Sequence, residues 1–178
     1  MTGFDPIAFV DLVRREQITH TFLVPPQFSA ILSLENLEKD SFNSLKTILS
    51  AGSPLRLDVK ENILTNMSEN LFELYGFSEG FATMLKPHDQ RKKFGSVGTP
   101  VLGFEIKIID EKGNECSPNV AGEIAGYGAG MMKEYYNEVE LTNSLIWTDN
   151  RGRSFIKSGD TGSSVSYTHL TLPTKEGV

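Results

Sequence analysis

The feature that most constrains the fold is an alternation of helix-like and strand-like segments between residues 5 and 84. "DPIAFVDLVRREQI" places Asp5 before Pro6 and repeats apolar residues on one face, which is typical of a capped helix. "HTFLVPP", "LKTILSAGS" and "LFELYGFSEG" are typical of short strands, the first ended by prolines. "QFSAILSLEN" and "PLRLDVKENILTNM" indicate helices between them, and we expect Pro54 to open the second. This order favours a parallel sheet with helices packed on it.

The pattern changes near Phe94. "GSVGTPV", "FEIKIID", "AGEIAGYG" and "SLIWTDNRGRSFIKSGD" are typical of strands separated by turns that contain Gly, Asp or Asn. We therefore predict an α/β fold class, with a partial parallel βα sheet in residues 1–92 and a β-rich, barrel-like flank in residues 93–164.

Charge and composition narrow the class of partner. The net charge is −6, which argues against a protein devoted to nucleic acid or to an anionic membrane, because both require clustered Lys and Arg. No run approaches the ~20 apolar residues of a membrane span, and the first residues do not resemble a signal peptide. The single cysteine, Cys116, excludes a disulfide framework and fits a cytoplasmic protein. We expect small-molecule partners, no nucleic acid and no transmembrane segment.

The last stretch differs from the rest. "VSYTHLTLPTKEGV" does not continue the β pattern, and it matches the translation of a transposase sequencing adapter. We expect residues 165–178 to be a non-native tail and the natural sequence to be interrupted near Ser164. The alternative is a genuine β-hairpin of Thr and Leu residues.

A hydroxyl and a carboxylate follow the third predicted strand directly. In "LFELYGFSEG", Gly76 ends the apolar pattern, and Ser78 and Glu79 come next. Ligands of open α/β sheets bind at the carboxyl ends of strands. The position of these side chains therefore predicts a ligand site at this edge.

Four motifs in order carry a resemblance to a known family. The motifs are "SLKTILSAGSPL", "LFELYGFSEG", "AGEIAGYGAGMMKEYYNEVELT" and "FIKSGDTG". In sequence and spacing they resemble the motifs of the adenylate-forming superfamily. Within that superfamily they are most similar to those of acyl-CoA synthetases. The resemblance covers residues 3–162. It implies an ATP-dependent acid–thiol ligase that activates a carboxylic acid as acyl-adenylate and transfers it to CoA, with ATP/AMP, Mg²⁺ and CoA bound.

The resemblance also implies roles for single residues, each of which suits its chemistry. Glu79 offers hard oxygens to Mg²⁺, and Ser78, where the family has Thr, can donate to an α-phosphate oxygen. Tyr75 presents an aromatic face to adenine, while Gly76 permits close approach of chain and ligand. The resemblance further implies that the backbone of Glu73, Leu74 and Gly76 lies close to the adenine.

Two further segments complete the implied site. Gly52, Ser53 and Pro54 form a turn that lines the nucleotide and acyl pockets in the family, and Asp160 is suited to accept both ribose hydroxyls. Each residue also has a purely structural interpretation. Tyr75 can be a half-buried strand aromatic, Glu79 a cap of the next segment and Asp160 a turn residue. The joint occurrence of the motifs favours the functional interpretation.

Three functions stay open for the parent protein. The first is an acyl-CoA synthetase, of which this chain is an inactive internal fragment, because the family's phosphate loop and catalytic lysine fall outside these residues. The second is an amino-acid adenylation domain that acts with a carrier protein. The third is a non-catalytic module that kept the AMP-binding fold.

Overall fold

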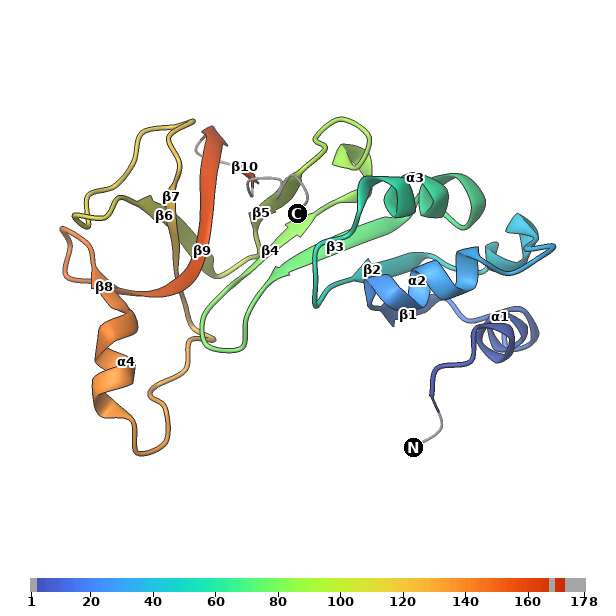
Figure 1. Ribbon diagram of the computed structural model, residues 1–178, viewed down its shortest axis with the longest axis horizontal. Coiled ribbons are helices and arrows are strands. Elements are labelled where there is room, and N and C mark those ends of the chain that lie inside the picture. The colour runs from blue at the N-terminus through green and yellow to red at the C-terminus, as the bar shows by residue number, and fades with distance from the viewer. Residues whose placement is uncertain (1–2, 167–168, 172–178) are drawn as a thin grey trace. The chain divides into compact units, whose positions relative to one another are not determined.

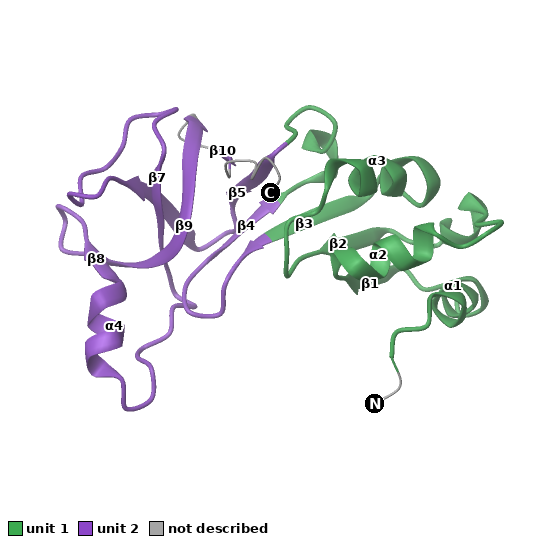
Figure 2. Cartoon of the chain, in the orientation of Figure 1, with its two compact units in different colours: residues 1–74, 85–94 green, residues 75–84, 95–178 purple. Residues whose placement is uncertain are grey.

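The computed structural model describes residues 3–166 and 169–171 and divides the chain into two compact units (Figures 1 and 2). The first unit contains residues 1–74 and 85–94, and the second contains residues 75–84 and 95–178. Each unit has its own hydrophobic core. The subdomain boundaries predicted from the sequence stay a prediction.

The first unit is a βα layer. Its elements in chain order are α1 (Pro6–Arg15), β1 (His20–Leu23), α2 (Pro25–Leu32), η1 (Lys39–Phe42), β2 (Thr47–Ser50), α3 (Leu57–Asn66), β3 (Leu71–Gly76) and η2 (Pro87–Asp89). The last two residues of β3 belong to the second unit. β2 pairs in parallel with both β1 and β3, which confirms the predicted parallel sheet.

Local sequence signals explain most element boundaries here. The Asp5 carboxylate accepts hydrogen bonds from the backbone N–H groups of Ile7 and Ala8, so it caps α1 as predicted. The prolines after β1 start α2 instead of only ending the strand, since proline suits the first helical turn. Pro54 does not open α3. That helix begins at Leu57, because Arg56 is extended, with ψ of 144°.

The second unit is mostly sheet. Its elements are β4 (Ala82–Leu85), β5 (Ser96–Pro100), β6 (Phe104–Ile109), β7 (Gly122–Gly128), α4 (Val139–Leu145), β8 (Ile146–Thr148), β9 (Ser154–Ser166) and β10 (His169–Thr171). The last residue of β4 belongs to the first unit. The strands follow the order β4-β5-β10-β9-β7-β6, with β8 beside β9, and their pairs are antiparallel. Among the described strands no pairing joins β6 back to β4, so this β-rich flank is an open sheet.

Part of the expected tail is ordered into this sheet. β10 pairs with β5 and β9, Leu170 is 5% exposed, and the Ser96 hydroxyl donates to the Leu170 carbonyl at 2.7 Å. Residues 167–168 and 172–178 lie outside the described residues. The foreign origin of residues 165–178 stays a prediction.

Candidate functional site

Tyr75 and Asp160 meet across the second unit. The Tyr75 hydroxyl, near the end of β3, donates a hydrogen bond of 2.8 Å to Oδ2 of Asp160 in β9. Burial raises the pKa of the Tyr75 phenol, and the bond to Asp160 raises it further, so tyrosine remains a proton donor. The structure thus brings together two residues that the sequence assigned to one nucleotide site.

A bulge in β9 presents Asp160. Residues 158–160 lie opposite Ile124 of β7, where the register between the two strands shifts. The Ser158 hydroxyl donates to the Ile124 carbonyl and accepts from the Asp160 N–H, while the Gly159 N–H donates to the Glu123 carboxylate. Gly159 has a φ of 75°, which favours glycine. Such bulges re-aim side chains beside functional sites, and Asp160 is exposed here.

The turn after β3 carries Ser78 and Glu79. In this turn the Phe77 N–H donates to the Phe81 carbonyl, and the Ser78 side chain is exposed. Gly76 is needed because a Cβ there would lie 2.2 Å from the Phe81 carbonyl oxygen. The close approach at Gly76 is therefore made by the chain's own backbone, and its contact with a nucleotide stays a prediction.

Glu79 is held by the segment before α4. The Tyr135 hydroxyl donates to Oε1 of Glu79 at 2.7 Å, and the Met132 N–H donates to the Glu79 carbonyl at 2.8 Å. The hydrogen bond to Glu79 raises the pKa of the Tyr135 phenol. Tyr135 was not predicted as a site residue, although the "YYN" motif contains it.

The Glu79 carboxylate is the acidic group that the turn after β3 offers to a nucleotide-bound magnesium ion. Among the side chains that the structure describes, no cluster of three His, Cys, Asp or Glu is placed to bind a metal. Magnesium commonly takes one or two carboxylates and completes its shell with phosphate and water. A single Glu79 carboxylate is compatible with that pattern, and its role as a metal ligand stays a prediction.

The remaining predicted residues belong to the first unit. Gly52, Ser53 and Pro54 are exposed in the turn after β2, and Gly52 has a φ of 91°. Glu73 and Leu74 lie in β3, before the residues assigned to the second unit. The convergence of these five residues with the second-unit residues stays a prediction.

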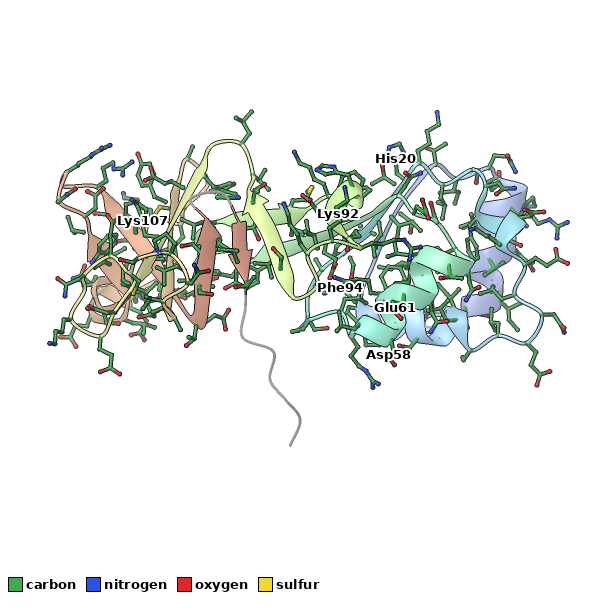
Figure 3. The ribbon with its side chains drawn as sticks, turned by 90° about the horizontal axis from the view of Figure 1, so that it is seen from above. His20, Asp58, Glu61, Lys92, Phe94 and Lys107 are labelled. Carbon is green, nitrogen blue, oxygen red and sulfur yellow. The ribbon has the colours of Figure 1, made fainter. Side chains whose placement is uncertain are left out.

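A buried ion pair in the first unit involves Glu73. The Lys60 ammonium of α3 lies 2.5 Å from Oε1 of Glu73, and the two side chains are 3% and 17% exposed. Burial raises the pKa of the Glu73 carboxyl, while the Lys60 charge opposes that rise. Asp58 and Glu61 lie on the exposed side of the same helix (Figure 3). Lys60 shares the apolar face of Ile63 and Leu64, so helical spacing was the signal that could have found it.

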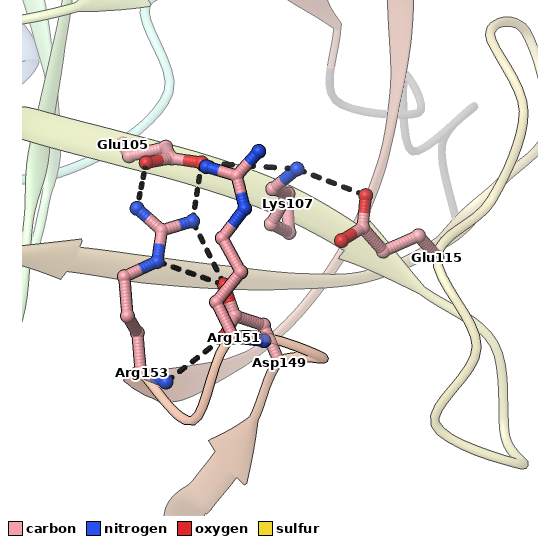
Figure 4. A network of polar contacts seen from close by, with 6 residues as sticks. All are labelled: Glu105, Lys107, Glu115, Asp149, Arg151 and Arg153. Carbon is pink, nitrogen blue, oxygen red and sulfur yellow. Dashed lines mark hydrogen bonds and ion pairs between the residues drawn. The ribbon is translucent and has the colours of Figure 1, made fainter.

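A second ionic cluster lies in the β-rich unit (Figure 4). Arg153 donates to both carboxylate oxygens of Glu105 and to Asp149, and Lys107 contacts Glu105 and Glu115. The guanidinium carbon of Arg153 also lies 5.3 Å from the Phe155 ring centre. These groups and Arg151 surround a hollow of about 240 Å³. Three acids balance three cations there, so the cluster has no excess of either charge.

Relatives of known function cover most of this chain. 4-Coumarate–CoA ligase 1 from Oryza sativa subsp. japonica is 31% identical over 169 residues, which are 91% of this chain and 29% of that protein. Amide bond synthetase McbA from Marinactinospora thermotolerans is 25% identical, with a TM-score of 0.85 over 97% of this chain and 35% of McbA. O-succinylbenzoate coenzyme A synthetase from Bacillus subtilis, in complex with ATP and magnesium, is 27% identical, with a TM-score of 0.81 over 95% of this chain and 34% of that one.

These matches show the family of the chain and the share of its relatives' length that the chain covers. The chain spans about a third of the length of these relatives. The described residues contain no helix that is long and apolar enough to cross a bilayer. The family of AMP-binding enzymes matches residues 1–136. With more than half of its residues matched, and with four motifs of that family in order, this chain belongs to the AMP-binding enzyme family.

Proposed function

We propose that the parent of this chain is an ATP-dependent ligase that converts a carboxylic acid to an acyl-adenylate and then to a CoA thioester. The observation that carries the proposal is the hydrogen bond of Tyr75 to Asp160, because it unites two family motifs that lie 85 residues apart. The rice relative, which is named a CoA ligase, supports the acid–thiol class.

The proposed reaction has two balanced steps. A carboxylate oxygen of the acid attacks the α-phosphorus of ATP, and the bond to the bridging oxygen of pyrophosphate breaks. The thiolate of CoA then attacks the acyl carbon, and AMP leaves with the oxygen that joined it to the acyl group. Magnesium, when bound with ATP, neutralises phosphate charge.

The chain's own side chains suit binding and orientation. Asp160 has one carboxylate oxygen engaged by Tyr75, and Oδ1 has no hydrogen-bond partner in the described part of the chain, so it can accept from ribose. The Tyr75 ring, half-buried and edge-on to Phe81, offers an apolar surface to adenine. Ser78 is exposed and can donate to phosphate. Glu79 supplies the carboxylate for the metal–nucleotide complex.

An amine is a second candidate for the group that accepts the acyl moiety. One of the solved structures that this chain resembles is an amide bond synthetase, so an amine is a candidate acceptor in place of CoA. A carrier-protein thiol is the remaining alternative. A cytoplasmic location stays a prediction that rests on the single cysteine, and the absence of a nucleic-acid partner stays a prediction as well.

The test uses the full-length parent protein with a panel of aromatic and aliphatic acids. Hydroxylamine traps acyl-adenylate as a hydroxamate, and AMP release reports the complete reaction with CoA, with amines or with carrier protein. We expect hydroxamate with at least one acid and AMP release stimulated by CoA. Stimulation by amines alone would select the second candidate, and hydrolysis of ATP to ADP without hydroxamate would contradict the proposal.

A further inference from the structure

We propose that Tyr135 is a positioning residue that fixes the Glu79 carboxylate for the metal–nucleotide complex. The inference rests on the proposed function and adds to it a residue that does not itself contact substrate. The hydrogen bond from Tyr135 to Glu79 joins the "YYN" segment to the "GFSE" segment, although the two residues are 56 positions apart in the chain.

Glu79 is attached to one neighbouring segment at two points. The Met132 N–H holds its backbone carbonyl at 2.8 Å, and the Tyr135 hydroxyl holds Oε1 at 2.7 Å. A glutamate at a turn has several accessible rotamers, and a fixed donor on one carboxylate oxygen selects among them. Oε2 has no hydrogen-bond partner within the described residues, so the second oxygen remains free to bind a ligand while the first is held.

The holding segment is itself anchored. The Tyr135 N–H donates to the hydroxyl oxygen of Thr142 at 2.9 Å, and that hydroxyl donates to the Glu138 carbonyl at 2.8 Å. Thr142, in α4, is 7% exposed, which shields both bonds from water. Tyr135 and Thr142 are seven positions apart, and the hydrogen bond between them closes a loop that fixes the tyrosine backbone. Thr142 supports Tyr135, which in turn supports Glu79.

Removal of a group that orients a metal-binding carboxylate usually weakens metal affinity about 10–100-fold. Tyr135→Phe deletes the donor and keeps the ring, so packing is preserved. Tyr136→Phe is the matched control, since Tyr136 is the next residue and is 90% exposed. Thr142→Val removes the anchor while leaving the tyrosine hydroxyl in place.

The experiment measures binding of the Mn²⁺–ATP complex to the full-length parent by water proton relaxation, without acid or CoA. We expect Tyr135→Phe to weaken binding about 10-fold, Thr142→Val to weaken it less, and Tyr136→Phe to leave it unchanged. We also expect Tyr135→Phe to weaken binding no further in a Glu79→Gln background, because the tyrosine acts through that carboxylate.

Wild-type affinity in Tyr135→Phe, or full additivity with Glu79→Gln, would overturn the proposal. The melting temperature of Tyr135→Phe is measured alongside, and a variant that keeps the wild-type melting temperature with weakened binding separates positioning from a purely structural role. The binding measurement requires no turnover. A parent that binds Mn²⁺–ATP through Tyr135 and Glu79 but forms no hydroxamate would therefore contradict the proposed function and leave the positioning role standing.

Discussion

The hydroxyl of Tyr75 and the carboxylate of Asp160 lie 2.8 Å apart, although 85 residues separate them in the chain. The bond joins the end of β3 to the bulge of β9. The Tyr75 hydroxyl donates to Oδ2 of Asp160, so Oδ1 is the carboxylate oxygen of this pair that can accept a hydrogen bond from a ligand.

Asp160→Ala should weaken nucleotide binding more than Tyr75→Phe does. The alanine variant removes the proposed ribose acceptor, and hydrogen bonds to charged groups contribute about 1.5–3 kcal/mol, which corresponds to a roughly 10–150-fold rise in the KM for ATP. Tyr75→Phe removes only the orienting bond, so a smaller rise is expected. Initial rates of acyl-adenylate formation at varied ATP test both. An Asp160→Ala variant with wild-type KM and kcat would remove this residue from the site.

The Lys60–Glu73 pair predicts a pronounced non-additivity in stability. Lys60→Met leaves the buried Glu73 carboxylate without its cation and should lower the free energy of unfolding by about 3–5 kcal/mol. Adding Glu73→Leu should recover much of that loss, because the unpaired charge disappears. Urea unfolding of the 178-residue chain measures the free energy of unfolding of the two single variants and the double variant, with exposed Glu61→Gln as the control. Simple addition of the two single effects would show that the ion pair is not coupled.

The Arg153 cluster predicts loss of stability in acid. Hydrogen bonds from Arg153 hold the pKa of the Glu105 carboxyl below its ordinary 4.5. Burial tends to raise the pKa of Asp149, but hydrogen bonds from Arg153 and Arg151 outweigh it and lower that pKa below 3.8. The unfolded chain therefore binds more protons than the folded chain as the pH falls from about 5 through these lowered values, so stability is present above that range and falls within it.

Arg153→Met should make stability between pH 5 and 3 less dependent on pH, because both carboxyls lose their charged donor. Arg91→Met is the matched control, since Arg91 makes 3.4 Å contacts with the Glu69 carboxylate and the Leu64 carbonyl, and the Arg91 and Glu69 side chains are more than half exposed. Thermal unfolding across this pH range measures the slopes. Equal slopes in the wild type and Arg153→Met would contradict the assigned pKa directions.

β10 predicts a measurable effect of the last residues on stability. A chain that ends at Ser164 loses the buried Leu170 side chain, whose burial contributes about 1.5–3 kcal/mol, and the hydrogen bond from Ser96. We expect a lower urea midpoint, and Leu170→Asp should reproduce most of the change. Foreign origin of the tail does not exclude such pairing, because the backbone groups of β5 and β9, between which β10 lies, can pair with any strand. An unchanged midpoint after truncation would contradict the placement of β10.

Sequence alone predicted the features that short segments determine. Asp5 and Pro6 specify the start of α1, because they act on the backbone of the residues next to them. The periodicity of apolar residues indicates the change from helix-containing to β-rich structure along the chain. The start of α3 was wrong by three residues, because a proline after a strand can open a helix or simply lie in the turn before it.

The candidate site residues come from sequence motifs, and their roles stay predictions, whereas no motif identified the contacts that these residues make. Tyr75, Glu79 and Asp160 came from motifs, and the structure joins the first and third by a hydrogen bond. The pairs of Tyr135 with Glu79 and Lys60 with Glu73 depend on how distant segments pack, which no local pattern encodes. The helical spacing of Lys60 indicated burial, but it did not identify the partner.

The most direct measurement of the central claim compares the two half-reactions of the full-length parent with Glu79→Gln. This change removes the carboxylate charge and keeps the side-chain shape. We predict that acyl-adenylate formation from acid and ATP falls by several powers of ten, whereas thioester formation from supplied acyl-adenylate and CoA changes far less. Equal losses in both half-reactions would mean that Glu79 supports the fold and not the adenylation chemistry.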